Sequence, residues 1–259
     1  MKWLLFLTVM AMFTSKSFAK VQTRDVDYKD GKVELQGYLA YDDSTTAKRP
    51  GVLIFHEWKG PSSYERSRAE QLAQMGYVAF VADVYGKGMR LTNMDEYRAE
   101  STKYKSDRPL TRERARAALD TLRQQPMVDP QRIAAIGFCF GGMVALELAR
   151  SGADVAGVVT FHGALDSPKP EDARNIKGKV LVLHGADDPT MKPEVITAFQ
   201  DEMRNAGVDW QFVSYGGAVH SFSNPASGSD KSKGAAYDEK AARRSWEAMA
   251  VFFKEIFGS

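Results

Sequence analysis

The sequence predicts an α/β fold with a mostly parallel central sheet and helices on both of its faces. Short apolar segments alternate along the chain with longer amphipathic ones, which is the order that parallel strands and their crossover helices produce. Several apolar segments, such as Val52–Phe55, contain no polar residue, as expected of strands buried on both faces. The 259 residues show no internal repeat and no linker, so residues 20–259 are expected to form one domain with a large core.

Strands are expected where an apolar, β-branched run lies between polar turns. The first, Lys32–Tyr41, would pair with Val21–Tyr28 as an antiparallel hairpin at one edge of the sheet. The strands of the parallel part would be Gly51–Phe55, Tyr77–Val84, Arg132–Ile136, Val155–Phe161, Val180–His184 and Trp210–Tyr215.

Helices are expected in the amphipathic segments between these strands. The first four are Tyr64–Met75, Thr111–Gln125, Gly141–Arg150 and Pro193–Ala206. A last helix would run from about Gly234 to Phe257, because its apolar residues recur every three or four positions and therefore share one face. The segment Gly86–Arg108 is polar and poorly periodic, which predicts a loop or a small helix over one end of the sheet.

Residues 1–19 have the pattern of a secretory signal peptide. Lys2 precedes the apolar run Trp3–Phe13, and small residues follow at Ser17 and Ala19. The run is too short to span a bilayer, which takes about 20 residues of helix. Cleavage after Ala19 would leave an exported protein that is periplasmic or secreted.

The composition excludes several classes of partner and cofactor. Lys and Arg number 35 and Asp and Glu 33, a formal net charge of +2, and two of the lysines lie in residues 1–19. Such a chain has no bulk electrostatic reason to bind nucleic acid or an anionic membrane. With Cys139 as the one cysteine, neither an internal disulfide nor a zinc site built from several cysteines is possible.

The segment Gly137–Gly142 predicts a sharp turn between a strand and a helix. Glycines stand two positions before and two after Cys139, where side chains would collide as the chain reverses. The turn would hold Cys139 in a strained conformation at a helix N-terminus, whose positive dipole favours a thiolate. Two other interpretations are a buried, inert cysteine and a phosphate-binding loop. A phosphate loop, however, would have Lys and Ser or Thr where Met143-Val144 stands.

A thiol nucleophile needs a base, and His220 is the predicted one. In folds with such a turn, the acid and then the histidine follow the nucleophile along the chain, and His220 alone lies after a suitable acid. Asp188 is the predicted acid and Asp187 the alternative; either could instead cap the helix that follows. The other three of the four histidines are expected at strand ends in structural or space-filling roles: His56, His162 and His184.

The turn after Gly51–Phe55 brings a carboxylate to the same edge of the sheet. Glu57, if ionised beside a thiol, would oppose its activation, so either it has a switchable role or it is an exposed loop acid. The backbone N–H groups of Trp58 and Phe140 are predicted to form an oxyanion hole.

Taken together, these segments resemble the dienelactone hydrolase family of the α/β-hydrolase superfamily, over nearly all of the chain after residue 19. The segments that carry the resemblance, in the family's order, are His56-Glu57-Trp58, Ala82–Gly86, Gly137–Gly142, Gly185–Asp188 and His220-Ser221-Phe222.

The resemblance implies an α/β-hydrolase fold and hydrolysis of enol-lactones or related esters, without metal or cofactor. It implies that Cys139 is the nucleophile, His220 the base and Asp188 the group that orients His220. Glu57 would hold the resting thiol and release it when substrate binds. The substrate pocket would be lined by Tyr85, Ser221, Phe222 and Asn224.

One departure concerns the substrate. The family's founding type has an arginine four residues after the histidine, where it is implicated in binding the substrate carboxylate, and this chain has Asn224 there. The bidentate anion clamp is therefore missing at that position, and Lys59, Lys87 or Arg90 would have to replace it. We expect an ester or lactone as substrate, without dienelactone being implied. The alternatives are a general carboxylesterase or thioesterase, a non-catalytic binding protein on this fold, and a thiol redox protein.

Overall fold

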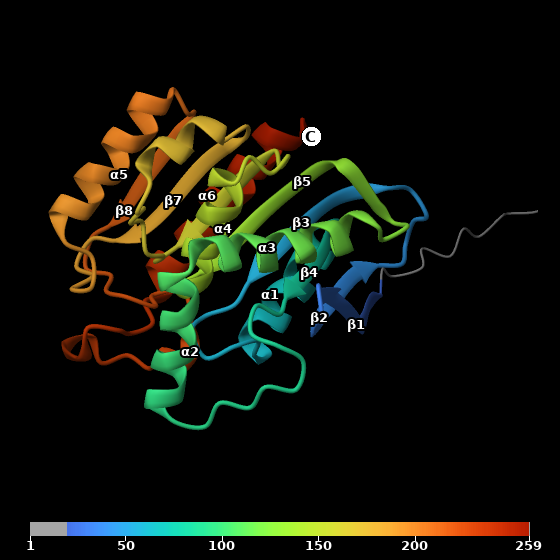
Figure 1. Cartoon of the computed structure of the whole chain (residues 1–259), viewed down its shortest axis with the longest axis horizontal. Coiled ribbons are helices and arrows are strands. Elements are labelled where there is room, and N and C mark those ends of the chain that lie inside the picture. The colour runs from blue at the N-terminus through green and yellow to red at the C-terminus, as the bar shows by residue number, and fades with distance from the viewer. Residues whose placement is uncertain (1–19, 259) are drawn as a thin grey trace, which may run out of the picture.

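An eight-stranded sheet runs through residues 20–258, the part of the chain that the computed structural model describes (Figure 1). Its strands lie in the order β1-β2-β4-β3-β5-β6-β7-β8. They are β1 (Val21–Asp30), β2 (Val33–Asp42), β3 (Arg49–Phe55), β4 (Val78–Ala82), β5 (Val128–Phe138), β6 (Gly157–Phe161), β7 (Lys179–Gly185) and β8 (Trp210–Tyr215). From β4 to β8 every neighbouring pair is parallel, which confirms the predicted α/β fold.

The predicted edge hairpin is present and is longer than expected. Strands β1 and β2 pair antiparallel from Val21 opposite Asp42 to Asp30 opposite Val33. Gly31, with a φ of +57°, makes the turn, because glycine enters the left-handed region without a steric penalty. Strand β2 then joins β4, also antiparallel. The hairpin therefore closes one edge of the parallel sheet.

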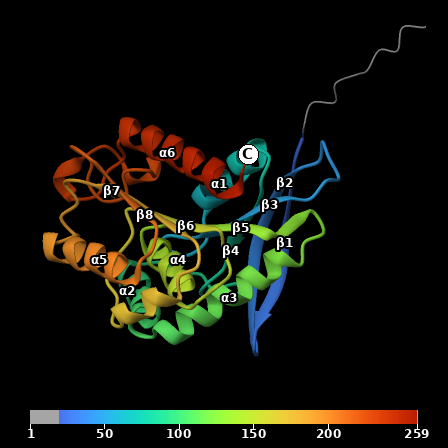
Figure 2. The same ribbon diagram turned by 90° about the horizontal axis from the view of Figure 1, so that it is seen from above.

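Helices cover both faces of the sheet, as Figure 2 shows: α1 and α6 lie on one side, and α3, α4 and α5 on the other. Along β3 the alternate residues Val52 and Ile54 pack toward the α1 and α6 side, whereas Leu53 and Phe55 pack toward α3 and α4. All four are fully buried, which explains why this segment has no polar residue. The helices are α1 (Ser63–Gln74), α2 (Met94–Ser106), α3 (Arg108–Arg123), α4 (Phe140–Arg150), α5 (Pro193–Ala206) and α6 (Glu239–Phe257).

Two helical segments differ from the prediction. The segment Gly86–Arg108 contains the 13-residue helix α2, capped by Asn93. Only Ser101 and Tyr104 of α2 are buried, so the sequence has no apolar stripe that would reveal it. The last helix begins later than Gly234, because the Asp238 carboxylate accepts the Ala241 N–H at 2.9 Å and caps the helix there. Three short 3₁₀ turns complete the structure: Pro170–Asn175, Pro225–Ser227 and Lys231–Lys233.

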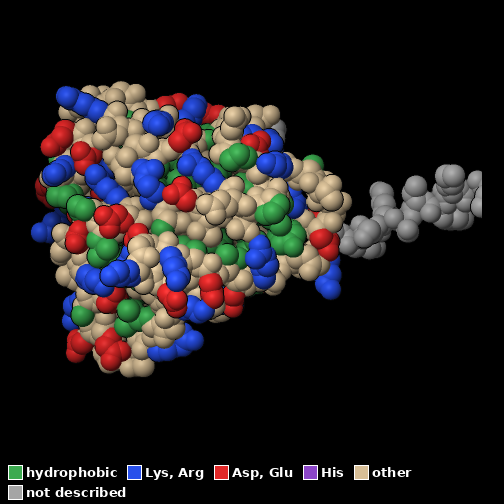
Figure 3. Space-filling view, turned by 45° about the vertical axis from the view of Figure 1, so that its right-hand side comes forward, with side chains coloured by type: hydrophobic (Ala, Val, Ile, Leu, Met, Phe, Trp, Pro, Cys, Tyr) green, Lys and Arg blue, Asp and Glu red, His purple; other side chains and the backbone are tan. Residues whose placement is uncertain are grey.

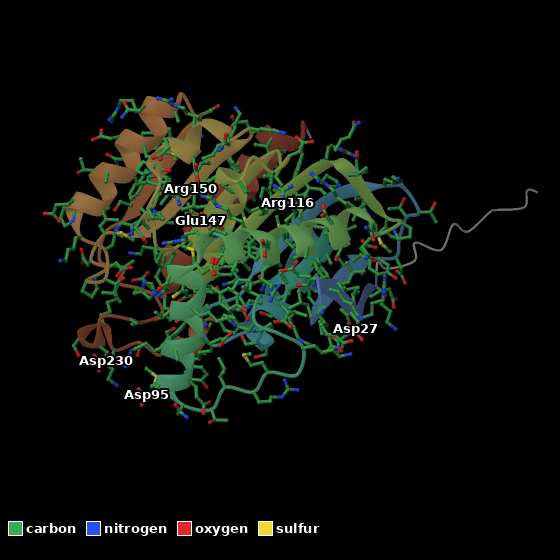
Figure 4. All side chains as sticks on the ribbon, in the orientation of Figure 1. Asp27, Asp95, Arg116, Glu147, Arg150 and Asp230 are labelled. Atoms are coloured by element: carbon green, nitrogen blue, oxygen red, sulfur yellow. The ribbon has the colours of Figure 1, made fainter. Side chains whose placement is uncertain are left out.

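A buried ionic cluster ties α4 to α5. Arg150, fully buried near the end of α4 (Figure 4), donates to both carboxylate oxygens of Glu202 at 2.8 Å and to Glu147 at 3.1 Å. Such a pair is stable in an apolar interior only when its geometry and hydrogen bonds are nearly complete. Helix α4, which follows Cys139, is therefore fixed at its far end to the neighbouring helix.

The surface agrees with the near-neutral charge of the chain. On the face shown in Figure 3, acidic and basic side chains are interspersed. Among the described helices none is both long and apolar enough to cross a bilayer. The predicted signal peptide, residues 1–19, lies outside the described residues, so it and the domain boundary at residue 20 stay predictions.

Candidate active site

Cys139 sits on a strained turn between β5 and α4. Its φ of +53° and ψ of −113° are unusual for a residue with a side chain, and such strain concentrates at functional sites. The flanking glycines are required. A Cβ on Gly137 would lie 1.9 Å from the Gly141 carbonyl oxygen, and one on Gly141 would lie 2.2 Å from that of Phe55. The sulfur is consequently presented, partly exposed, at the carboxyl end of the sheet.

His220 and Asp188 meet this sulfur from two other loops at the same edge. His220 Nε2 lies 3.1 Å from Cys139 Sγ, and His220 Nδ1 lies 2.8 Å from Asp188 Oδ2. A carboxylate can only accept, so Nδ1 carries a proton and donates it to Asp188. The alternative acid, Asp187, is exposed on the same loop. Asp188 is thus the carboxylate that the fold places against His220.

The second oxygen of Asp188 is held by a residue that the sequence analysis did not single out. The backbone N–H and the hydroxyl of Thr190 both donate to Asp188 Oδ1, at 2.8 and 2.6 Å. With Oδ2 taken by His220, both oxygens of this buried carboxylate are paired. The Asp188 side chain is therefore held in one orientation. Through its hydrogen bond it also orients the His220 ring.

These contacts change the pKa values of both groups. Burial by itself lowers the pKa of His220, but the Cys139 sulfur and the Asp188 carboxylate outweigh it and raise the pKa to about 10. For Asp188, burial acts to raise the pKa, and the hydrogen bonds from His220 and Thr190 lower it below its ordinary value. An imidazolium 3.1 Å from the sulfur is the environment that stabilises a thiolate.

Two backbone N–H groups, those of Phe140 and Trp58, have no acceptor among the described residues. Phe140 is the first residue of α4, so its N–H cannot bond within the helix. The N–H of Trp58 lies in the turn after β3, which packs on the start of α4 through Gly141. Both groups are the donors that the sequence predicts for an oxyanion.

Glu57 differs from the prediction that it holds the resting thiol. Its Oε1 accepts from the Ser221 hydroxyl at 3.1 Å and its Oε2 from the Asn224 amide at 2.8 Å. The sulfur bonds instead to His220. Ser221, whose φ is +59°, donates its hydroxyl to the carboxylate, so each oxygen of Glu57 has a partner other than Cys139.

Glu57 is nevertheless an unusual acid. Burial, followed by the nearby Glu65 carboxylate, raises the pKa of Glu57 above its ordinary value. The folded protein then keeps a proton at pH values where the unfolded chain has lost it. The free energy of unfolding therefore falls as the pH rises from 4.5 through the raised pKa.

Glu57→Gln is expected to be more stable than the wild type at pH 8 and to lose that advantage near pH 4, because the amide cannot ionise. Each unit by which the pKa is raised corresponds to about 1.4 kcal/mol. Thermal unfolding at several pH values measures the difference. The control is Glu247→Gln, whose carboxylate is 60% exposed and paired with Arg243; its effect should be below about 1 kcal/mol. A pH-independent difference for Glu57→Gln would contradict the assignment.

The four residues that were predicted to line the substrate pocket do not share one location in the structure. Phe222 is fully buried and packs in the core against His162 and Tyr215, so its side chain is not exposed to a pocket in this structure. Ser221 and Asn224 face Glu57. Tyr85 is almost fully buried, and its hydroxyl donates to the Trp58 carbonyl at 2.9 Å, which makes it a support of the turn beside the sulfur.

The three basic residues that were considered as replacements for the anion clamp make no hydrogen bond to Cys139 in the part of the chain that the structure describes. Lys87 forms an ion pair with Asp27 on the edge hairpin at 2.5 Å. Lys59 and Arg90 line a cavity of about 130 Å³ next to Tyr85, and Cys139 does not line it. Within residues 20–258, no group of three or more His, Cys, Asp or Glu side chains is placed to hold a metal ion.

The group that anchors the Glu57 turn, Glu65, was not among the residues predicted from the sequence. The carboxylate of Glu65, buried in the first turn of α1, accepts the Glu57 N–H at 3.1 Å and the Ser62 N–H at 2.9 Å. Ser62 and Glu65 form a capping box. The spacing Ser-x-x-Glu at the start of a helix is its sequence signature and could have indicated it.

A parallel sheet with helices on both faces and a strained turn between β5 and α4 is the architecture of an α/β-hydrolase. The chain belongs to the Dienelactone hydrolase family, whose family model matches residues 35–257. It is accordingly a hydrolase of lactones or esters.

Three similar proteins show how far the likeness extends. A solved structure titled "m3DLH" is 46% identical, with a TM-score of 0.88, over 91% of this chain and 98% of that one. A dienelactone hydrolase-like promiscuous phosphotriesterase, P91 from metagenomic libraries, is 43% identical, with a TM-score of 0.86, over 91% and 98%. A putative carboxymethylenebutenolidase of Aquifex aeolicus is 29% identical over 88% of this chain and 96% of its own length.

Proposed function

We propose that this protein hydrolyses small carboxylic esters or lactones through a triad of Cys139, His220 and Asp188 and a covalent acyl-enzyme. One observation carries the proposal: an unbroken chain of hydrogen bonds, 3.1 and 2.8 Å long, runs from the sulfur through His220 to the carboxylate. A nucleophile, a base in contact with it and a third group that orients the base are the parts that covalent acyl transfer requires.

In the first half of the reaction, the Cys139 thiolate attacks the carbonyl carbon. The oxyanion that forms accepts from the N–H groups of Phe140 and Trp58. As the intermediate collapses, the C–O bond to the leaving alkoxide breaks, and His220 gives its Nε2 proton to that oxygen. The product is a thioester on Cys139; in a lactone the alcohol stays attached to the acyl chain.

In the second half, His220 takes a proton from water, and the hydroxide equivalent adds to the thioester carbon. The C–S bond breaks, the acid leaves and the thiolate is restored beside the imidazolium. Asp188 stays ionised throughout and stabilises the charged form of His220. Because Asn224 is neutral and its amide already donates to Glu57, the substrate needs no carboxylate of its own.

An acyl-enzyme on Cys139 is the expected intermediate. With p-nitrophenyl butyrate, rapid mixing should release a burst of about one nitrophenolate per protein. Acid quenching and peptide mass analysis should then place the butyryl group on the peptide that contains Cys139. Prior alkylation of Cys139 serves as the control and should remove both signals. A butyryl group on any other residue would contradict the proposed mechanism.

A second activity, hydrolysis of phosphotriesters, is favoured by the 43% identical relative that is titled a promiscuous phosphotriesterase. The same thiolate would attack phosphorus and displace an aryloxide, and water would then break the P–S bond. A panel of an aryl dialkyl phosphotriester, dienelactone, simple aryl esters and thioesters, each assayed with and without Cys139, ranks the substrate classes.

We also propose that the protein acts outside the cytoplasm, in the periplasm or as a secreted enzyme. The pattern of Lys2, the apolar run Trp3–Phe13 and Ala19 supports export. The mature N-terminus would then be Lys20.

A further inference from the structure

His56 is a buried histidine that the triad does not use. It is fully buried at the end of β3, between two neighbouring loops. Its Nε2 lies 3.2 Å from the Val84 backbone N–H, and its Nδ1 lies 2.6 Å from the Glu57 carbonyl oxygen. An amide N–H can only donate and a carbonyl can only accept, so Nε2 carries the lone pair and Nδ1 the proton. These partners select a neutral imidazole with one defined tautomer.

The Glu57 carbonyl shares a peptide unit with the N–H of Trp58. A trans peptide is planar, and its C=O and N–H point in opposite directions. The Glu57 carbonyl accepts from His56 Nδ1 at 2.6 Å and from the Gly60 N–H at 3.2 Å. Fixing this oxygen therefore fixes the direction of the Trp58 N–H, which has no acceptor among the described residues and is the predicted oxyanion donor.

The same imidazole also contacts the residue that carries the second donor. Its ring stacks on Phe140, with centroids 5.8 Å apart and planes 25° apart. Below this contact, a Cβ on Gly141 would lie 2.7 Å from the His56 carbonyl oxygen, so the two backbones touch. His56 thus joins the turn after β3 to the first turn of α4, and with them the two N–H donors.

We propose that His56 is the positioning residue of the oxyanion hole, and that its Nδ1 proton holds the Glu57–Trp58 peptide with the Trp58 N–H directed at the site. The inference rests on the proposed function, because it assigns a role within acyl transfer. His56 touches no reacting atom. It acts through the peptide, so its contribution appears where the negative charge on oxygen develops.

Two substitutions separate the two hydrogen bonds of His56. In His56→Asn the amide nitrogen can replace Nδ1 and donate to Glu57, but nothing replaces Nε2. In His56→Gln the amide oxygen can replace Nε2 and accept from Val84, but the donor to Glu57 is lost. Each variant loses one buried hydrogen bond, so their thermal stabilities should be similar.

His56→Gln is expected to lower kcat for p-nitrophenyl butyrate by about 10²-fold, because misplacement of a catalytic group by about 1 Å costs that much. KM should change little, since the lost interaction belongs to the transition state. His56→Asn should restore most of kcat. Alkylation of Cys139 by iodoacetamide builds no charge on a carbonyl oxygen, so its rate should be the same in wild type and both variants.

Several results would overturn the proposal. One is an equal loss of kcat in both variants, and another is a loss of alkylation that parallels the loss of kcat; each would make His56 merely structural. A wild type without Cys139-dependent hydrolysis would instead refute the proposed function, and this inference with it. If His56→Gln does not fold, the nitrogen-15 chemical shifts of the His56 ring in the wild type test the proposal instead. Nδ1 must be protonated and Nε2 unprotonated at the assay pH, and the opposite tautomer or an imidazolium refutes the proposal.

Discussion

Cys139→Ala is expected to lower kcat/KM for an activated ester by about 10⁴- to 10⁶-fold, the loss that follows removal of the nucleophile from a triad. The remaining rate would come from the two N–H donors and from binding. Alanine accepts the positive φ of the turn no worse than cysteine does, and the sulfur is only partly buried. The free energy of unfolding should therefore change by less than about 1 kcal/mol, which thermal unfolding verifies.

Cys139→Ser is the matched variant for this experiment. It keeps a nucleophilic atom on the same strained turn, but a hydroxyl does not form an ion pair with the imidazolium as a thiol does. Its activity should exceed that of Cys139→Ala and remain far below that of the wild type. If Cys139→Ala turned over the ester at a rate comparable to the wild type, the sulfur would have no place in the mechanism.

Asp188→Asn is expected to reduce kcat by about 10⁴-fold, as loss of the orienting carboxylate does in other triads. The amide can offer its NH₂ group to Nδ1 and thereby select the wrong tautomer of His220. It also removes a charge that raises the pKa of His220. The matched control is Asp187→Asn, one residue away on the same loop and exposed, which should leave kcat nearly unchanged.

The pH dependence of alkylation at Cys139 provides a second measurement for Asp188→Asn. In the wild type, the pKa of His220 of about 10 implies that the imidazolium persists beside the sulfur through neutral pH. Loss of the Asp188 charge lowers the pKa of His220, so the imidazolium should be lost at a lower pH. Equal losses in Asp187→Asn and Asp188→Asn would show that the loop, and not the carboxylate contact, supports the activity.

Much of the fold could be predicted because its strands are buried on both faces. A continuous apolar run such as Val52–Phe55 has few other places in a soluble protein. Strand β8 and helix α5 begin and end where the sequence analysis placed them. Helix α2 could not be predicted in this way, since a helix with two buried residues has almost no apolar periodicity.

The candidate site was partly predictable for a different reason. The carboxyl ends of parallel strands meet at one edge of the sheet, so polar residues that follow separate strands converge there. This places Cys139, Asp188 and His220 together without any knowledge of side-chain directions. Where each side chain points within that edge depends on atoms from several loops at once. Glu57 and Phe222 show the limit, because one turned to Ser221 and Asn224 and the other into the core.

The sequence by itself determined the class of fold, the positions of most strands along the chain and the residue at the strained turn, since these follow from burial and from glycine spacing along the chain. The tertiary structure alone decided that Glu57 pairs with Ser221 and Asn224, and that His56 Nδ1 lies 2.6 Å from the Glu57 carbonyl oxygen. The physical reason is that a hydrogen bond requires two atoms within about 3 Å in the correct direction, and no pattern along one chain contains that distance.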